Sequence, residues 1–421
     1  MIAPLGRAGS TGFGHMRGGL RYPMMDRIYL DNNATTCPAP EVVAAMHEAA
    51  ELLWANPSSI HRFGQAVRQR VELARASVAR LIGAKPRELL FTSGGTESNN
   101  LALSGLSPDV LLVTTIEHVA VREPAEAFES TGGRFLRLAV GPNGLVDPAE
   151  LELAVAKHRH DAGTVLVSIQ WANNETGMIQ PMARLAEVVA RQRAAARADH
   201  QKVKIFLHTD ATQAVGKLPV DVGIAGVDLL SASAHKFHGP KGVGVLWCRS
   251  GLRLNPIQRG GPQEWQRRGG TENTTAIIGA GVAADLAVAF LSCPQHIEEL
   301  AALRNRFERG VVDAVTGALV NGIGAPRLWN TSNIAFFGLA AEAILLGLSE
   351  RGLCASAGAA CSSGSLDPSP VLLAMGVDEP MAHGSIRFSL SRGTTSAEID
   401  GAIKCVPEVV SRLQRIMPMV G

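Results

Sequence analysis

The stretch Leu89-Leu90-Phe91-Thr92-Ser93-Gly94-Gly95-Thr96-Glu97 joins a strand-like apolar run to a polar, glycine-rich turn, and a helical pattern follows it. Further apolar or β-branched runs recur along the chain, and helical stretches separate most of them. These runs are Val110–Thr115, Phe135–Ala139, Val165–Ile169, Ile205–His208 and Val243–Trp247. Strands that alternate with helices predict an α/β fold in which a mainly parallel sheet is covered on both faces.

Polar, chemically reactive residues cluster where these runs end. In a parallel sheet, ligands bind outside the carboxyl ends of the strands, so clusters at those ends predict one shared binding site. The clusters are Ser93–Glu97, Glu117–His118, Asn173–Glu175, Asp210–Gln213 and Ser231–Lys236. Their repeated position indicates that a ligand binds at this edge of the sheet.

The length of the chain predicts more than one domain. It has 421 residues, which is too many for a single hydrophobic core, and its pattern becomes mostly helical after about residue 288. We expect a flexible N-terminal tail over residues 1–26 and a large domain over residues 40–288. Residues 27–39 and 289–421 would form a smaller α+β domain that contains the strand-like runs Asn333–Phe337 and Ser385–Ser389.

The composition of the chain bears on which partners the protein binds and on where in the cell it is found. A formal net charge of +2 gives no reason to expect nucleic-acid binding, and the longest apolar runs are strand-sized, which predicts no membrane-spanning segment. The N-terminal segment lacks the apolar core of a secretory signal, and no two of the 6 cysteines have C-x-x-C spacing. We therefore expect a cytoplasmic protein with reduced thiols and no metal site.

Three clusters contain residues that suit a phosphorylated cofactor. Gly95 and Thr96 follow a strand and begin a helix, where backbone N–H groups bind anions, although a plain tight turn has the same pattern. Lys236 lies among small and apolar residues, which favours covalent amine chemistry; a solvated surface lysine is the alternative. Asp210 could hold a proton on a pyridine nitrogen, or it could cap a helix.

Three more residues extend this set, each with a structural alternative. His118 could stack on a flat ring or move a proton, or it could be structural. Arg387 could bind a carboxylate with its guanidinium fork, or it could lie on the surface. Cys361 lies among Gly, Ala and Ser residues, a composition typical of a mobile loop, so it is either a nucleophile or an unreactive linker thiol.

Together these are the parts of a pyridoxal-phosphate (PLP) enzyme that acts on amino acids, and the chain resembles a known family. It resembles the cysteine desulfurases of the nitrogen-fixation and iron–sulfur-assembly type, within the class V aminotransferase-like PLP enzymes. The resemblance runs from about Ile28 to Leu413. It rests on Tyr29–Thr36, Asn56–His61, Phe91–Asn99, Asn173–Gly177, Asp210–Gly216, His235–Gly242, Arg268–Glu272 and Ser385–Arg392.

The resemblance implies a PLP-dependent aminotransferase-like (type I) fold and roles around the cofactor ring. Lys236 would carry PLP covalently, and Asp210 would pair with the ring nitrogen. His118 would stack on the ring. Gln213 and Asn174 would bind the side of the ring that carries the phenolic oxygen.

The resemblance also implies a phosphate site, a substrate site and a homodimer. The phosphate ligands would be Gly95, Thr96, Ser233, His235 and Thr271 of the partner subunit. Arg387, with Asn174, would bind the substrate carboxylate. Cys361 would be the nucleophile, because its loop occupies the position of the family's cysteine loop. That loop departs from the family pattern, which has serines where this chain has Ala357 and Ala359.

The implied activity is the conversion of L-cysteine to L-alanine, with the sulfur held as a persulfide on Cys361. An iron–sulfur scaffold or another acceptor protein would then receive the sulfur, for general or nitrogenase-specific cluster assembly. A selenocysteine lyase or a class V transaminase would use the same scaffold and is the alternative. A non-catalytic sulfur-trafficking protein is a further alternative, although it would need neither Lys236 nor Asp210.

Overall fold

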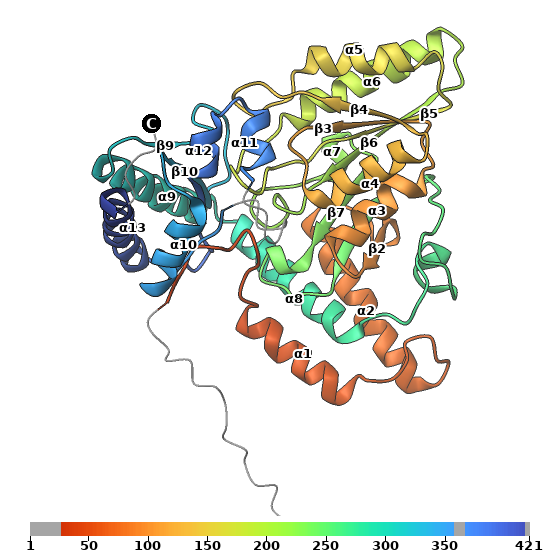
Figure 1. Ribbon diagram of the computed structural model, residues 1–421. Helices are drawn as coiled ribbons and strands as arrows, with labels where there is room; N and C mark the ends of the chain where they lie inside the picture. Colours follow the sequence, from red (N-terminus) through yellow and green to blue (C-terminus); the bar gives the residue numbers. More distant parts are fainter. Residues whose placement is uncertain (1–26, 358–366, 417–421) are drawn as a thin grey trace, which may run out of the picture.

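The computed structural model describes residues 27–357 and 367–416 (Figure 1). The predicted N-terminal tail, residues 1–26, lies outside the described residues, and so does Cys361. The described chain forms one large sheet with helices on both sides and, beside it, a smaller group of helices around short strands (Figure 1).

The large sheet has seven strands in the order β2-β8-β7-β6-β5-β3-β4. Their bounds are β2 Leu89–Thr92, β3 Val110–Thr114, β4 Arg134–Leu138, β5 Thr164–Ser168, β6 Lys204–Asp210, β7 Leu229–Ser233 and β8 Gly244–Cys248. Only β8 is antiparallel, to both β2 and β7, while the other pairs are parallel. The predicted mainly parallel sheet is therefore confirmed.

Two hydrophobic clusters cover the two faces of this sheet, as the period of two along a strand requires. Val110 and Leu112 of β3 belong to one cluster, and Leu111 and Val113 belong to the other. The first face is covered by α2 (Arg62–Leu81), α5 (Pro148–His158), α6 (Met182–Ala198) and α8 (Thr274–Leu291). The second face is covered by α3 (Gly95–Gly105) and α4 (Val119–Ser130).

Helix α8 corrects one expectation from the sequence. By length and composition alone, this helix is long and apolar enough to cross a membrane. The sequence analysis, in contrast, predicted that the chain has no segment able to span a membrane. In the structure, half of this helix is buried, and alanine and glycine positions let α1 (Pro40–Leu52) and α2 pack closely against it. A Cβ on Gly281 would lie 2.6 Å from Ala74 of α2, so this helix is built for close helix–helix contact.

The smaller group combines an antiparallel sheet with a pair of short parallel strands. The sheet has the order β12-β10-β9, with β9 at Ala318–Val320, β10 at Thr331–Phe336 and β12 at Ser385–Ser389. The pair is β1 (Ile28–Tyr29) with β11 (Leu353–Cys354). The surrounding helices are α9 (Pro294–Ala314), α10 (Ala341–Glu350), α11 (Pro370–Ala374), α12 (Glu379–His383) and α13 (Ser396–Ile416).

A separate hydrophobic cluster lies inside this group and takes Leu30 from the N-terminal segment, together with Phe307, Phe336 and Phe388. The remaining described elements are the short helix α7 (Val222–Ala225) and three 3-10 turns, η1 (Pro86–Glu88), η2 (Ala234–Lys236) and η3 (Gln263–Gln266). The exact division of the chain into two domains stays a prediction.

A buried ion pair joins α2, β2 and the η3 segment. The guanidinium of Arg75 makes two hydrogen bonds of 2.8 Å to the carboxylate of Glu264, and both side chains are almost fully buried. Arg75 also donates to the carbonyl of Leu89, while Glu264 accepts from the backbone N–H of Phe91. Glu264 adopts a positive φ of 46°, so this pair holds a strained segment against the edge of the sheet.

Replacing one partner of this pair should strongly destabilise the protein. Arg75→Met should lower the free energy of unfolding by about 3–5 kcal/mol, because it leaves Glu264 buried without its counter-ion. Arg80→Met in the same helix is the matched control, since it breaks an exposed pair with Asp285 and should cost less than about 1 kcal/mol. Urea denaturation followed by fluorescence measures both, and equal losses would contradict the prediction.

Candidate active site

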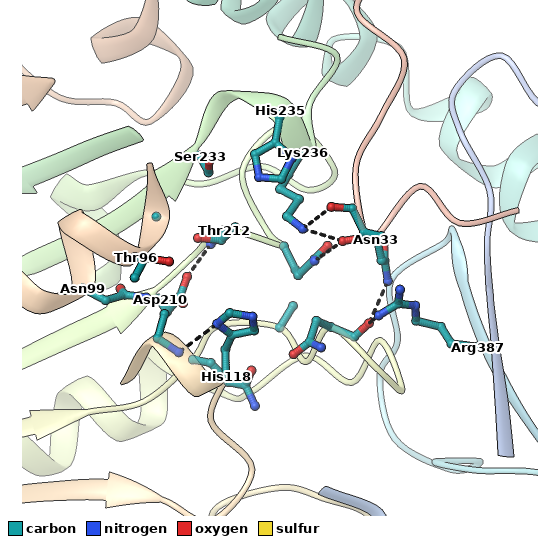
Figure 2. A pocket seen from close by; sticks show the side chains of 17 residues that line it. Asn33, Thr96, Asn99, His118, Asp210, Thr212, Ser233, His235, Lys236 and Arg387 are labelled. Carbon is teal, nitrogen blue, oxygen red and sulfur yellow. Dashed lines mark hydrogen bonds between the residues drawn. The ribbon is translucent and has the colours of Figure 1, made fainter. Parts of the chain in front are cut away.

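One cavity of about 370 Å³ opens at the carboxyl ends of the sheet strands, between the large sheet and β12. Figure 2 shows side chains from both parts of the protein pointing into it. The predicted site residues that line it are Gly95, Thr96, His118, Asn174, Asp210, Gln213, Ser233, His235, Lys236 and Arg387. The structure therefore brings together the clusters that the sequence placed at the strand ends.

The N-terminus of α3 forms one end of the cavity. Gly95 begins this helix, so its backbone N–H and that of Thr96 have no partner within the helix. A Cβ on Gly95 would lie 3.2 Å from Thr212 Oγ1, so the missing side chain leaves space at this end. The hydroxyl of Thr212 is buried and has no hydrogen-bond partner within residues 27–357 and 367–416. This end is suited to a phosphate group.

Ser233 and His235 complete the anion end from the strand β7 and the turn η2. The Nδ1 of His235 shares a hydrogen bond of 3.1 Å with Thr35 Oγ1. Burial lowers the pKa of His235 to about 4, and the nearby charges of Lys236 and Lys241 lower it further. Its imidazole is therefore neutral near pH 7, and it would bind a phosphate as a hydrogen-bond donor rather than as a cation.

Asp210 ends β6 and faces the cavity with a fixed carboxylate. Asn99 of α3 donates to Asp210 Oδ2 at 2.7 Å, and the backbone N–H of Thr212 donates to Oδ1 at 2.9 Å. These two bonds hold the plane of the carboxylate, which suits it to a protonated ring nitrogen. The other side-chain atom of Asn99, Oδ1, is buried without a hydrogen-bond partner in the described part of the chain.

His118 precedes α4 and its ring points into the cavity (Figure 2). Its Nδ1 accepts a hydrogen bond from the backbone N–H of Ala120 at 3.1 Å. Burial lowers the pKa of His118, although the negative charge of Asp210 acts in the opposite direction. The neutral ring therefore carries its proton on Nε2, where a reacting group could receive it.

Lys236 reaches into the cavity from the turn after β7. Its Nζ donates to the main-chain carbonyls of Asn33 and Ala34, both at 2.7 Å. These carbonyls belong to the N-terminal segment that also pairs with the small sheet. The amine is thus aimed at the cavity by two neutral acceptors, which suits a lysine that must exchange between a covalent bond and a free amine.

Arg387 enters the cavity from β12 on the opposite side. Its guanidinium donates to Asp31 Oδ1 at 2.7 Å and to the main-chain carbonyl of Asn174 at 3.2 Å. The Nε of Arg387 is buried and has no hydrogen-bond partner among the residues that the structure describes. A carboxylate in the cavity would supply an acceptor for this buried donor.

These features fit PLP. The cavity has a phosphate-binding end with an orphan hydroxyl at Thr212, a fixed carboxylate at Asp210 and a lysine amine at Lys236. The flat imidazole of His118 points into the same cavity (Figure 2). PLP needs a site of this kind, in which a carboxylate faces the ring nitrogen and a lysine carries the cofactor.

Two predicted site residues do not line this cavity in the described chain. Thr271 lines a separate cavity of about 160 Å³ with Ser93, Glu264 and Arg268. Cys361 lies outside the described residues. The residues that flank its segment are fixed: Ser356 pairs with Arg387 through two backbone hydrogen bonds, and Ser369 Oγ donates to Glu175 Oε2 at 2.5 Å.

Sequence reasoning assigned no role to several residues of the cavity, among them Asn33, Asn99, Thr212 and Gln170, and it named Glu117 only as part of the cluster Glu117–His118. Asn33, Asn99 and Thr212 line the cavity, and Thr212 and Asn99 both hydrogen-bond Asp210. Thr212 lies inside the cluster Asp210–Gln213 and could have been found there. Asn33 gave no such signal, because its contacts come from segments far away in the sequence.

Glu117 is a buried acid directly before His118. Its Oε1 accepts from Thr114 Oγ1 and from the backbone N–H of Gln170, both at 2.7 Å. Its Oε2 is buried without a hydrogen-bond partner in the described ranges. Burial raises the pKa of Glu117 to about 8, and the charge of Asp210 raises it further. Near pH 7 Glu117 is therefore mostly protonated and anchors the His118 turn as a neutral group.

The raised pKa predicts how stability depends on pH. The folded protein holds a proton on Glu117 up to about pH 8, whereas an unfolded chain releases it near the ordinary value of 4.5. The contribution of Glu117 to stability is thus fully present below about pH 4.5 and is lost as pH rises toward about 8. Glu117→Gln removes this dependence. The free energy of unfolding of the variant minus that of the wild type should therefore increase by at least about 1 kcal/mol from pH 5 to pH 8.

Urea denaturation of the cofactor-free proteins at both pH values measures this difference. Glu299→Gln, at an exposed position of α9, is the matched control and should follow the wild type. A constant difference between Glu117→Gln and wild type at the two pH values would contradict a protonated Glu117.

Comparison with known proteins identifies the family. The chain matches the family model of the class-V aminotransferases over residues 28–401. It is 44% identical over 403 residues to the cysteine desulfurase NifS of Azotobacter vinelandii, covering 94% of this chain and 95% of that protein. It is 43% identical over 399 residues to cysteine desulfurase 2 of Trichormus variabilis, covering 94% of this chain and 96% of that protein.

Solved structures agree with these relatives. A NifS-like protein superposes with a TM-score of 0.82 at 34% identity, covering 92% of this chain and 100% of the other. A NifS-like protein from Rickettsia africae superposes with a TM-score of 0.81 at 30% identity, covering 91% of this chain and 99% of the other. The fold and family predicted from the sequence are confirmed: the chain belongs to the class-V aminotransferase family and, within it, to the PLP-dependent cysteine desulfurases.

Proposed function

We propose that this protein converts L-cysteine to L-alanine and takes the sulfur as a persulfide on Cys361. The observation that supports this most directly is the convergence of Lys236, Asp210, His118 and Arg387 on one cavity beside the N-terminus of α3. The proposed sulfur chemistry depends on Cys361, whose role comes from the sequence resemblance.

Arg387 would bind the substrate carboxylate. The buried Nε of Arg387 needs an acceptor, and its other nitrogens are held by Asp31 and by the carbonyl of Asn174. A fixed guanidinium selects α-carboxylates and places the α-carbon of the substrate toward the interior of the cavity. The side chain of Asn174 lines the same wall.

PLP, when bound, supplies an electron sink that makes the α-proton of an amino acid acidic. Asp210, held by Asn99 and Thr212, would keep a proton on the ring nitrogen, which is the state in which the ring withdraws electrons. Gly95, Thr96, Thr212, Ser233 and His235 would hold the phosphate. Gln213 would donate to the phenolic oxygen of the ring.

Lys236 and His118 would handle protons. Lys236 Nζ, once free, would accept the α-proton, and the carbonyls of Asn33 and Ala34 orient it for this step. His118 carries its proton on Nε2, because Nδ1 accepts from Ala120, so it can accept a proton only through a change of partner at Nδ1 and otherwise donates a hydrogen bond to a group on its face of the cavity. Both groups are half-buried, which limits the access of bulk water to them.

Cys361 would act on the sulfur of the substrate. Its thiolate attacks the substrate sulfur, a sulfur–sulfur bond forms, and the bond between sulfur and the β-carbon breaks. The electron pair of the broken bond stays on the β-carbon, which takes up a proton and becomes the methyl group of alanine. Ser356 and Ser369 fix the two flanks of the Cys361 segment beside Arg387 and Glu175, which supports a nucleophile that reaches this cavity.

The persulfide would pass to an acceptor protein, and we propose an iron–sulfur scaffold as its class. The relatives are named NifS and IscS cysteine desulfurases, which supports a role in supplying sulfur for iron–sulfur clusters. Whether the acceptor serves nitrogenase or general assembly is a separate question for binding experiments. A cytoplasmic location, with no membrane or nucleic-acid partner, stays a prediction from the sequence.

We also propose a homodimer in which Thr271 of the partner subunit completes each phosphate site. In its own chain, Thr271 lies in a different cavity from the phosphate end. Large apolar side chains are exposed on the segments around it and on the turn after α1, which supports a contact with a second copy. These side chains are Trp54, Ile60, Ile257 and Trp265.

The first test of the function is Cys361→Ala. The wild type should be yellow with PLP and should form alanine and sulfide from L-cysteine in the presence of a reductant. Cys361→Ala should keep the visible absorption but lose alanine formation by at least about 100-fold, because the nucleophile is gone. Cys37→Ala, at an exposed cysteine, is the matched control and should retain activity.

Each result of this experiment has a definite reading. Equal formation of alanine and sulfide by Cys361→Ala and wild type would reject Cys361 as the nucleophile and favour another PLP reaction. Preference for L-selenocysteine by a Cys361-independent route would favour a selenocysteine lyase. A wild-type protein that stays colourless with added PLP would reject the cofactor assignment.

The shared site can be tested by mixing two inactive variants. Lys236→Ala removes the lysine of its own site, and Thr271→Asp should weaken the partner's site by placing a negative charge against the phosphate. If the site is shared, heterodimers of the two variants contain one site with both residues intact, so mixing under subunit exchange should restore about a quarter of wild-type activity. No recovery despite verified heterodimers would show that Thr271 serves its own chain.

A further inference from the structure

Lys217 is a lysine buried behind the site that the proposed mechanism does not use. It lies in the turn after β6, and only 4% of its surface is exposed. Gly216 precedes it with a φ of 78°, and a Cβ on Gly216 would lie 2.5 Å from Phe237. Only glycine permits this close turn, which sends the side chain of Lys217 inward, toward the site, instead of toward solvent.

The partners of Lys217 are two side-chain amides. Its Nζ donates to Asn33 Oδ1 at 3.0 Å and forms a short hydrogen bond with Gln213 Oε1. A buried lysine usually faces a carboxylate, but no salt bridge to Lys217 is present among the described residues. The Trp329 Nε1–H donates to the carbonyl of Lys217 at 2.8 Å, which anchors the turn to the neighbouring part of the protein.

These contacts fix which way each amide faces. The Nζ of Lys217 has at least two N–H donors whether or not it carries a charge, and they point to Asn33 and Gln213, so the amide atom of Gln213 that faces Lys217 is its oxygen. Gln213 Nε2 then faces the other way and donates to the main-chain carbonyl of Asn33 at 3.0 Å. The same carbonyl accepts from Lys236 Nζ, so this N–H lies next to the lysine amine at the cavity wall.

The amide of Asn33 is oriented in the same way. Its Oδ1 accepts from Lys217 and from Asn330, so its Nδ2 is left to donate to Thr331 Oγ1 and to the carbonyl of Asn174. Arg387 donates to that same carbonyl of Asn174. One lysine thus sets the polarity of a hydrogen-bond chain that reaches both sides of the cavity.

We propose that Lys217 is a positioning residue for the reaction, which holds the Gln213 amide with its N–H donor toward the phenolic oxygen of PLP. Without the lysine, only the carbonyl of Asn33 would favour this orientation, and the Gln213 amide could more readily rotate by half a turn and present an oxygen instead. Two acceptors would then repel each other at the ring. This inference rests on the PLP site of the proposed function and not on the fate of the sulfur.

The surroundings of Lys217 disfavour a positive charge on its amine, which neutral amide acceptors can accommodate. Burial lowers the pKa of Lys217 well below its ordinary value, and the charges of Lys236 and Arg387 lower it further. His238 and Arg392 line the small cavity on its other side. Burial also lowers the pKa of His238 to about 4, so it adds no charge near pH 7.

The pH titration of the visible absorption of the PLP-loaded protein tests this proposal. A hydrogen bond to the ionised phenolic oxygen lowers the pH at which the bound cofactor takes up a proton. Lys217→Met, of similar length but without a donor, should raise the titration midpoint by about one pH unit and weaken PLP binding by about tenfold. Lys217→Gln keeps an N–H donor for Gln213 Oε1 and should stay within about half a pH unit of the wild type.

A double variant separates positioning from general damage. If Lys217 acts through Gln213, then Gln213→Met/Lys217→Met should have the same midpoint as Gln213→Met alone. Lys404→Met, at an exposed position of α13, is the matched control and should have the wild-type midpoint. Should Lys217→Met fail to fold, Lys217→Ala, which cannot reach Gln213, replaces it in the same comparison.

The outcomes that overturn the proposal are equally definite. An unchanged midpoint in Lys217→Met, even with a lower melting temperature, would reduce Lys217 to a structural role. Shifts that add in the double variant would show that Lys217 acts by its charge and not through Gln213. These readouts need only bound PLP, so a wild type that titrates normally but forms no alanine would reject the proposed function and leave this inference intact.

Discussion

The main-chain carbonyl of Asn33 accepts hydrogen bonds from Lys236 Nζ at 2.7 Å and from Gln213 Nε2 at 3.0 Å, and the rest of the site depends on this contact. The backbone N–H of Asn33 donates to Ser389 of β12, so the same residue also holds the small antiparallel sheet. The segment that contains Asn33 thereby hydrogen-bonds both the large sheet region and the small antiparallel sheet at the cavity. The cavity exists because parallel strands end there, but its final geometry is set by this one residue.

Burial determines the charge state of the groups around this contact. The pKa of Glu117 rises to about 8 and that of His235 falls to about 4, both chiefly through burial, and the pKa of His118 falls for the same reason. Near pH 7 these groups therefore act as neutral donors and acceptors. These three groups therefore add no charge that would oppose the cofactor or the substrate.

The sequence predicted the parts of the site that are local and missed those that are not. The cluster Asp210–Gln213 and the turn at Gly95 could be found, because a strand, a polar residue and a glycine follow each other directly. Asn33 and Asn99 could not, because their importance comes from contacts with residues more than 100 positions away. The apolar helix α8 was misjudged for a related reason: composition alone does not distinguish a core helix from a membrane span, whereas its packing against α1 and α2 does.

Arg387 contacts the rest of the protein in two separate ways, through its side chain and through its backbone. Its side chain serves the cavity, while its backbone is paired with Ser356, and Ser369 is held in turn by Glu175. Because Ser356 and Ser369 are each held by a contact of their own, a change in the number of residues between them would leave both attachments unchanged. Doubling the length of a flexible loop costs only about 0.6 kcal/mol in closure entropy. Variants with a longer or shorter segment between Ser356 and Ser369 could therefore arise and deliver sulfur to different acceptor proteins, while the chemistry of the cavity stays the same.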